Sequence, residues 1–171
     1  MKYSYSAFYE KNAAYFRARP NLKKGLLFFD RFLTLGFVLG YTTFVLGAIA
    51  LEYPAEDLVK IFFAPALCLL LVSLLRLAIY RPRPYSENGA NIEPLYRKKG
   101  STGHSFPSRH IACAFVIAFT LLPYSMGAGI CLTVFGLLLI YARFALGWHY
   151  PTDLLGGAIL GTLCGMIAFV F

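Results

Sequence analysis

Three long stretches of the chain carry no charged residue, and they constrain its fold more than any other feature. They cover residues 32–51, 111–142 and 154–171. The hydrocarbon core of a bilayer, about 30 Å thick, is crossed by roughly 20 helical residues. A soluble helix of comparable length would place charged residues between its apolar stripes, and these stretches have none. They therefore predict membrane-spanning helices.

The longest uncharged stretch, residues 111–142, needs to be divided. It is too long for one span at ordinary tilt, and Pro123 interrupts it. We expect a tight helical hairpin, with spans at 108–122 and 128–145. Such a hairpin returns the chain to the membrane face from which it started.

With this hairpin, the chain is expected to form an all-α membrane bundle of five spans in a single domain. The other spans are predicted at 32–51, 58–79 and 152–171. In the last one, glycines recur every four residues at positions 157, 161 and 165, which favours close approach of another helix.

Two polar segments lie outside the predicted spans. Residues 1–30 mix aromatic and basic side chains, which is typical of an interfacial segment at headgroup depth. Residues 80–106 are rich in proline and glycine and predict a polar loop near the functional site.

Residues with anion-binding chemistry gather at the span ends that five antiparallel helices bring to one face. They are Arg76, Arg83, Ser108, Arg109, His110, Arg143, His149 and Asp153. Guanidinium groups match phosphate oxygens bidentately, and a serine ahead of a helix start adds a hydroxyl beside the positive end of the helix dipole. The pattern predicts a phosphate site.

The two histidines suggest how such a site could act on phosphate. Asp153 follows His149 by four residues and could hold one ring nitrogen, leaving the other free to attack phosphorus. His110 could protonate the leaving oxygen and later activate water. No metal and no cofactor are expected, because Asp153 is the one acidic residue in this group.

At these residues the sequence resembles the phosphatidic acid phosphatase type 2 superfamily of membrane lipid phosphatases. The family's first motif, lysine followed after six residues by Arg-Pro, is matched by Arg76 and Arg83 with arginine replacing lysine. Its second motif, Pro-Ser-Gly-His, is matched by residues 107–110 with arginine replacing glycine. Its third motif, a Ser-Arg pair followed by histidine and aspartate, is matched by residues 142–153, where Ala142 replaces the serine.

The resemblance implies metal-independent hydrolysis of a lipid phosphate or diphosphate through a phosphohistidine on His149, with Asp153 as its partner and His110 as acid–base. It implies phosphate contacts from Arg76, Arg83, Ser108 and Arg143. Polyprenyl diphosphate, phosphatidylglycerol phosphate and phosphatidic acid all fit, with membrane lipids and no nucleic acid as partners. Lipid-to-acceptor phosphotransfer and non-catalytic lipid or anion binding or transport are the alternatives.

Several neighbouring residues carry weaker expectations. The Arg109 guanidinium either grips a second phosphate or turns aside towards lipid headgroups. Arg81 matches no motif position and is expected to contact headgroups, and His104 is expected to be a solvated loop histidine. Trp148 and Tyr150 are expected to mark the membrane interface.

The membrane side of the site has two opposing predictions. By the proposed topology, fifteen of the sixteen lysines and arginines lie on the site face, which the positive-inside rule assigns to the cytoplasm. The family resemblance points to the outer face of a bacterial plasma membrane. The basic run at 97–99 either recruits an anionic headgroup or is simply solvated.

Overall fold

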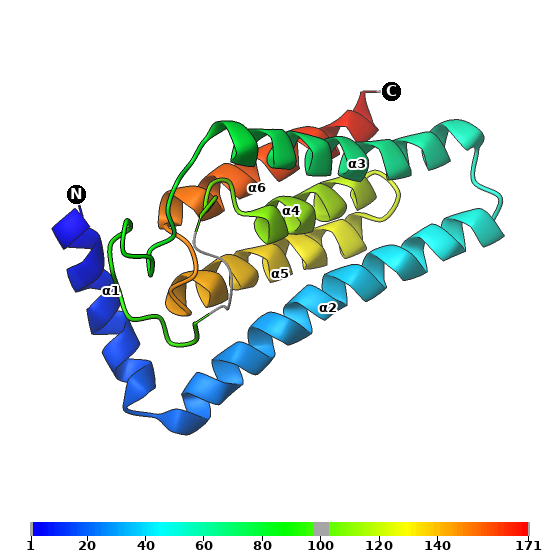
Figure 1. The fold of residues 1–171 in the computed structure, drawn as a ribbon. Coiled ribbons are helices and arrows are strands. Elements are labelled where there is room, and N and C mark those ends of the chain that lie inside the picture. Colours follow the sequence, from blue (N-terminus) through cyan, green and yellow to red (C-terminus); the bar gives the residue numbers. More distant parts are fainter. Residues whose placement is uncertain (1, 98–102, 171) are drawn as a thin grey trace.

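A computed structural model describes residues 2–97 and 103–170, which form helices joined by loops (Figure 1). The predicted all-α fold is confirmed. The elements are α1 (Lys2–Arg17), α2 (Pro20–Ala50), α3 (Ala55–Ala78), α4 (Arg109–Leu121), α5 (Met126–Ala145), α6 (Pro151–Gly165) and a short 3₁₀ helix, η1 (Met166–Phe169).

Helices α2 to α6 run back and forth along the bundle, so that α2, α4 and α6 begin at the end where α3 and α5 finish (Figure 1). Among the described residues, four stretches are long and apolar enough to cross a membrane: α2, α3, α5, and α6 with η1. Helix α4, predicted as a span, has only 13 residues. Most of its side chains are buried against α3, α5 and α6, so its ends do not have to meet lipid.

The predicted helical hairpin is confirmed in α4 and α5. The connection between them contains Pro123, and the Ser125 hydroxyl caps α5 by accepting a hydrogen bond from the Ala128 N–H at 3.4 Å. Because α5 runs back along α4, Arg109 and Arg143 lie at the same end of the bundle (Figure 1).

The glycines of α6 allow the close helix packing that the sequence predicted. A Cβ atom on Gly157 would lie 2.6 Å from the carbonyl oxygen of Ser108, and one on Gly165 would lie 2.5 Å from the Cβ atom of Phe119. The first turn of α6 therefore lies against the start of α4. There the Ser108 N–H donates to the carbonyl oxygen of Asp153 at 3.0 Å, which joins two of the predicted motifs.

The N-terminal prediction needs correction. An interfacial segment was expected through residue 30, but the chain turns at Ala18 and Arg19 and α2 begins at Pro20, a residue favoured at the first helical position. The α2 helix has 31 residues, a length of about 46 Å, and starts well ahead of the uncharged run. Helix α1 buries Tyr9 and Ala13 against protein, so one of its faces is covered by protein and not by lipid.

The loop between α3 and α4 is tied to this N-terminal helix and to the connection between α5 and α6. The Leu95 N–H donates to the Tyr9 hydroxyl at 3.1 Å, and the Trp148 indole N–H donates to the carbonyl oxygen of Tyr96 at 2.6 Å. Trp148 is 4% exposed, so the expectation that it marks the membrane interface is wrong. Lys98 and Lys99 lie outside the described residues.

Candidate active site

His149 lies in the short connection between α5 and α6 and is 2% exposed. Its Nδ1 atom is 3.1 Å from the carbonyl oxygen of Ser105. A carbonyl oxygen only accepts hydrogen bonds, so this contact requires the proton to sit on Nδ1. In the neutral ring, Nε2 then keeps its lone pair.

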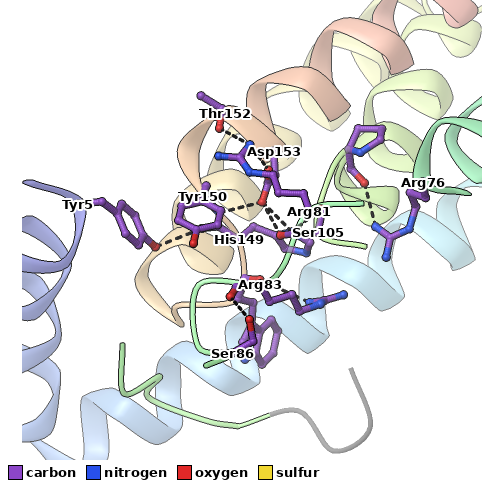
Figure 2. Close-up of polar contacts among 12 residues, drawn as sticks. Tyr5, Arg76, Arg81, Arg83, Ser86, Ser105, His149, Tyr150, Thr152 and Asp153 are labelled. Atoms are coloured by element: carbon purple, nitrogen blue, oxygen red, sulfur yellow. Dashed lines mark hydrogen bonds and ion pairs between the residues drawn. The ribbon is translucent and has the colours of Figure 1, made fainter. Parts of the chain in front are cut away.

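Asp153, in the first turn of α6, holds its carboxylate in a closed set of donors (Figure 2). Arg81 donates to Oδ1 at 2.7 Å, while the Ser105 hydroxyl and the Tyr150 N–H donate to Oδ2 at 2.5 and 3.0 Å. The Nδ1 atom of His149 is 3.7 Å from Oδ2, beyond hydrogen-bond length. The predicted pair is therefore brought together, but Ser105 is the nearer partner of the imidazole.

The surroundings of His149 keep its ring neutral. Burial lowers the pKa of His149 to about 4, because the protonated, charged ring would lack the hydration that it has in water. The nearby Asp153 carboxylate opposes this shift, while the guanidinium groups of Arg83 and Arg143 lower the pKa further. A neutral imidazole with a free Nε2 has the form that a nucleophile needs.

Arg81 and His104 do not behave as expected. Besides its bond to Asp153, Arg81 donates to the Thr152 hydroxyl at 2.8 Å and lies over the Tyr150 ring, with its central carbon 4.5 Å from the ring centre. It is thus a partner of the Asp153 carboxylate, which the sequence did not predict. The His104 ring is half-buried, with Nδ1 2.5 Å from the carbonyl oxygen of Arg76, so it is not simply solvated.

The predicted phosphate ligands are less completely bonded than the Asp153 carboxylate. Arg76 donates to the carbonyl oxygen of Pro107 at 2.9 Å, and Arg83 donates to that of Trp148 at 3.4 Å. Five buried donors of the described residues have no hydrogen-bond partner: Arg83 Nε, Ser108 Oγ, Thr120 Oγ1, and Nε and Nη1 of Arg143. Arg143 Nε is in an ion pair, and Thr120 lies in α4 outside the predicted ligands, which leaves Arg83 Nε, Ser108 Oγ and Arg143 Nη1. Buried donors are rarely left unpaired in proteins, so oxygens of a bound anion would complete them.

Positive charge also accumulates here. The guanidinium groups of Arg83 and Arg109 act electrostatically on that of Arg76, and Arg83 acts on Arg143. Arg109, at the start of α4, is exposed, and neither of its two predicted orientations is decided by this geometry. A set of like charges held at one end of a bundle is relieved by an anionic ligand.

Arg143 has a partner that the sequence did not predict. Its Nε lies 3.0 Å from Oδ1 of Asp30 on α2, and its Nη2 donates to the Thr34 hydroxyl at 3.1 Å. Asp30 is 3% exposed. The expectation that Asp153 is the one carboxylate among the site residues is therefore wrong. The overlooked signal was a lone carboxylate just ahead of an uncharged run, where such a residue is seldom unpaired.

His110 lies in the first turn of α4 and borders an open cavity of about 520 Å³. Arg143, Trp148 and Asp30 line the same cavity. The structure thus brings the two predicted histidines to one end of the bundle. His149 lies beside Asp153, and His110 lines a cavity that Arg143 also lines. The roles of these residues remain predictions.

Comparison with known proteins agrees with this arrangement. Undecaprenyl-diphosphatase BcrC of Bacillus subtilis (strain 168) is 32% identical over 98 residues, which are 57% of this chain and 49% of that protein. Lipid A 4'-phosphatase of Bacteroides thetaiotaomicron is 31% identical over 125 residues, 71% of this chain and 54% of that protein. The chain spans about half the length of these curated relatives.

A solved structure covers more of the chain. The crystal structure of Aquifex aeolicus LpxE superposes with a TM-score of 0.70 at 27% identity, over 95% of this chain and 94% of that one. The family profile described as "PAP2 superfamily" matches residues 57–171, which include α3 to α6 and every predicted motif. This multi-pass membrane protein therefore belongs to the PAP2 superfamily.

Proposed function

We propose that the chain hydrolyses a lipid phosphate or diphosphate through a phosphohistidine on His149. Nε2 of His149 bonds to phosphorus as the bond from phosphorus to the leaving oxygen breaks. The leaving oxygen takes the electron pair of that bond and a proton from His110. A water oxygen then bonds to phosphorus while the nitrogen–phosphorus bond breaks, and His110 takes the water's proton.

The remaining residues supply orientation and charge in this proposal. Arg76, Arg83, Ser108 and Arg143 hold the phosphate oxygens, which supports the transition-state charge without a metal ion. The Asp153 carboxylate stabilises the positive ring that forms when His149 attacks, and Arg81 and Ser105 keep that carboxylate in place.

One observation carries the proposal. The buried neutral imidazole of His149, with Nδ1 at the Ser105 carbonyl, lies near buried arginine donors that lack partners. A purely structural histidine would not need two nearby guanidinium groups with unpaired donor atoms. The names of the relatives, a diphosphatase and a phosphatase of lipid substrates, agree with this chemistry.

The test is a covalent trap combined with a product assay. Purified protein in detergent with EDTA is mixed with a panel of lipid phosphates, quenched within milliseconds and digested for mass spectrometry. We expect inorganic phosphate in solution and a phosphoryl group on the peptide carrying His149. His149→Gln should lose both, whereas the matched His104→Gln variant should still form the adduct. An adduct on another residue, or full turnover by His149→Gln, would remove the assignment of the nucleophile.

We also propose the bacterial plasma membrane as its location, because both curated relatives are bacterial. Helix α1 starts at the site end of the bundle and η1 lies at the other end (Figure 1). Reporter fusions at the two ends of the chain should accordingly report opposite sides of the membrane, and the side of the α1 fusion would identify the face that carries the site.

A further inference from the structure

The cavity beside His110 extends beyond the motif residues. Its longest wall is α2, where Leu27, Arg31, Leu35 and Val38 follow one another at intervals of three or four residues and so share a helix face. Arg97, from the loop before α4, also lines the cavity. Neither arginine belongs to a family motif, and α2 lies outside residues 57–171, the part that matches the family profile.

The direction of the proposed reaction decides which part of the substrate enters this cavity, and this step rests on the proposed function. In-line displacement places the leaving oxygen opposite the attacking His149 nitrogen. His110, as the acid that protonates this oxygen, marks the same side. Since His110 borders the cavity, the leaving group lies there.

We propose that Arg31 and Arg97 bind a second phosphate group on the leaving side, which makes a lipid diphosphate the preferred substrate class. The bond that breaks is then the phosphoanhydride bond. Its bridging oxygen leaves with the electron pair as part of a lipid monophosphate, and water later releases the transferred group as inorganic phosphate. The apolar side chains of Leu27, Leu35 and Val38 receive the first carbons of the lipid chain.

Charge supports this assignment. Within residues 2–97 and 103–170, neither Arg31 nor Arg97 takes part in a salt bridge, and both are exposed, so they are available to a ligand. A phosphate monoester, with a second pKa of about 6, departs as a stable anion. Cations beside it stabilise the charge that develops on the bridging oxygen, which an uncharged leaving group would not require.

The size and composition of the cavity agree with such a ligand. Its volume of about 520 Å³ lies within the range of small-molecule sites. Its lining combines arginine side chains with the apolar face of α2. The Arg143 side chain is 2% exposed, and its Nη1 has no hydrogen-bond partner in the described part of the chain. A lipid diphosphate has a charged headgroup followed by a hydrocarbon chain, which matches the arginines and the apolar side chains that line the cavity.

The test uses two substrates with the same chain, farnesyl diphosphate and farnesyl monophosphate, and measures phosphate release by the purified protein in detergent. In the Arg31→Gln/Arg97→Gln variant we expect kcat/KM for the diphosphate to fall at least about tenfold, the loss typical of a charge-assisted contact. The value for the monophosphate should stay within about threefold. Lys24→Gln removes a positive charge from an exposed position on α2 that does not line the cavity, and should change neither value.

Equal losses on the two substrates, or no loss on the diphosphate, would overturn the second phosphate site while leaving the phosphatase proposal intact. Wild-type protein that releases phosphate from neither of these substrates nor from phosphatidic acid would instead overturn the proposed function. Both arginines are exposed, so the variants should fold, and unchanged thermal unfolding of the detergent-solubilised protein checks this.

Discussion

The surroundings of Asp153 and of Arg143 differ although both groups are buried at the same end of the bundle. Asp153 belongs to a cluster with Arg81, Ser105 and His149, called the nucleophile cluster after the role proposed for His149. In this cluster its carboxylate receives three hydrogen bonds. Arg143 belongs to an anion cluster, formed with Arg76, Arg83 and Ser108. Four buried donors of this cluster have no hydrogen-bond partner among the described residues, and one of the four, Arg143 Nε, is in an ion pair with Asp30.

This difference indicates that the two clusters are prepared for different events. The nucleophile cluster is complete before the substrate arrives, so it fixes the tautomer and position of His149 in advance. In the proposed mechanism the anion cluster is completed by the substrate itself, since unsatisfied donors and like charges are both relieved by phosphate oxygens. Changes in the first cluster should therefore act mainly on kcat, and changes in the second should also act on substrate binding.

The largest effect is expected for Asp153→Asn. The amide keeps the size of the carboxylate but loses the charge that stabilises the attacking imidazole, and it cannot accept the same set of donors. We expect kcat to fall roughly 10⁴-fold, as for the aspartate of the serine-protease triad, with KM within a few-fold of wild type. Steady-state phosphate release measures both constants. A rise in KM without a fall in kcat would contradict the division into two clusters.

Arg83→Gln should have the next largest effect. The substitution removes a buried cation and its unpaired Nε from the anion cluster, so kcat/KM should fall about 100-fold. Because phosphate binding is weakened directly, the variant should also lose affinity for inorganic phosphate, measured as product inhibition. An unchanged inhibition constant would show that Arg83 does not contact the anion.

Asp30→Asn tests whether α2 contributes to the anion cluster. The Asp30 carboxylate accepts a hydrogen bond from Nη2 of Arg143, and its Oδ1 lies 3.0 Å from the Arg143 Nε. In the proposed mechanism this leaves Nη1 of Arg143 for the substrate. Without the carboxylate, the guanidinium loses its orientation and a buried charge loses its partner. We expect kcat/KM to fall about tenfold and the melting temperature to drop.

Two comparisons sharpen the Asp30 experiment. Saturating inorganic phosphate should restore more of the melting temperature in Asp30→Asn than in wild type, because the anion then supplies the missing negative charge. The milder Thr34→Val, which removes only a hydrogen bond to Arg143, should have a smaller effect on both measurements. Equal stabilisation of all three proteins by phosphate would exclude coupling between Asp30 and the anion site.

The smallest expected effect is a shift in the titration of His149. Its pKa of about 4 means that the ring is neutral above that value and becomes protonated, and so unable to attack, as the pH falls through it. Nuclear magnetic resonance of ring-labelled histidine measures this pKa directly in the ligand-free protein. Arg83→Gln removes a nearby positive charge and should raise the pKa, whereas Lys24→Gln should not. A His149 pKa near 6.5 in wild type would contradict its burial as a neutral ring.

Prediction from sequence succeeded where single residues and short spacings carry the information. Uncharged runs predicted the bundle, Pro123 predicted the hairpin, and the glycines of the last helix predicted close contact with another helix, which the structure shows to be α4. It failed at the start of α2, because the basic and aromatic residues before position 31 suit an interfacial segment and a helix extension equally well. That error placed Asp30 outside the site.

The partners of the charged groups were beyond sequence reasoning. Arg81 was assigned to headgroups because it matches no motif, yet it bonds Asp153. His104 was assigned to solvent because it lies in a loop, yet its ring bonds the carbonyl oxygen of Arg76. Such bonds depend on where a loop folds back over the bundle. Spacing along the chain contains no information on that path.

By itself, the sequence determined that this chain is a membrane bundle with histidines, arginines and a carboxylate at one end, because the transfer of a side chain into lipid depends on that side chain alone. Only the tertiary structure decided which carboxylate neutralises which cation and which nitrogen of His149 carries the proton. Asp30 and Arg143 are 113 positions apart, and their pairing depends on how α2 packs against α5. A hydrogen bond exists only when donor and acceptor come within hydrogen-bonding distance, and that distance is a property of the folded chain.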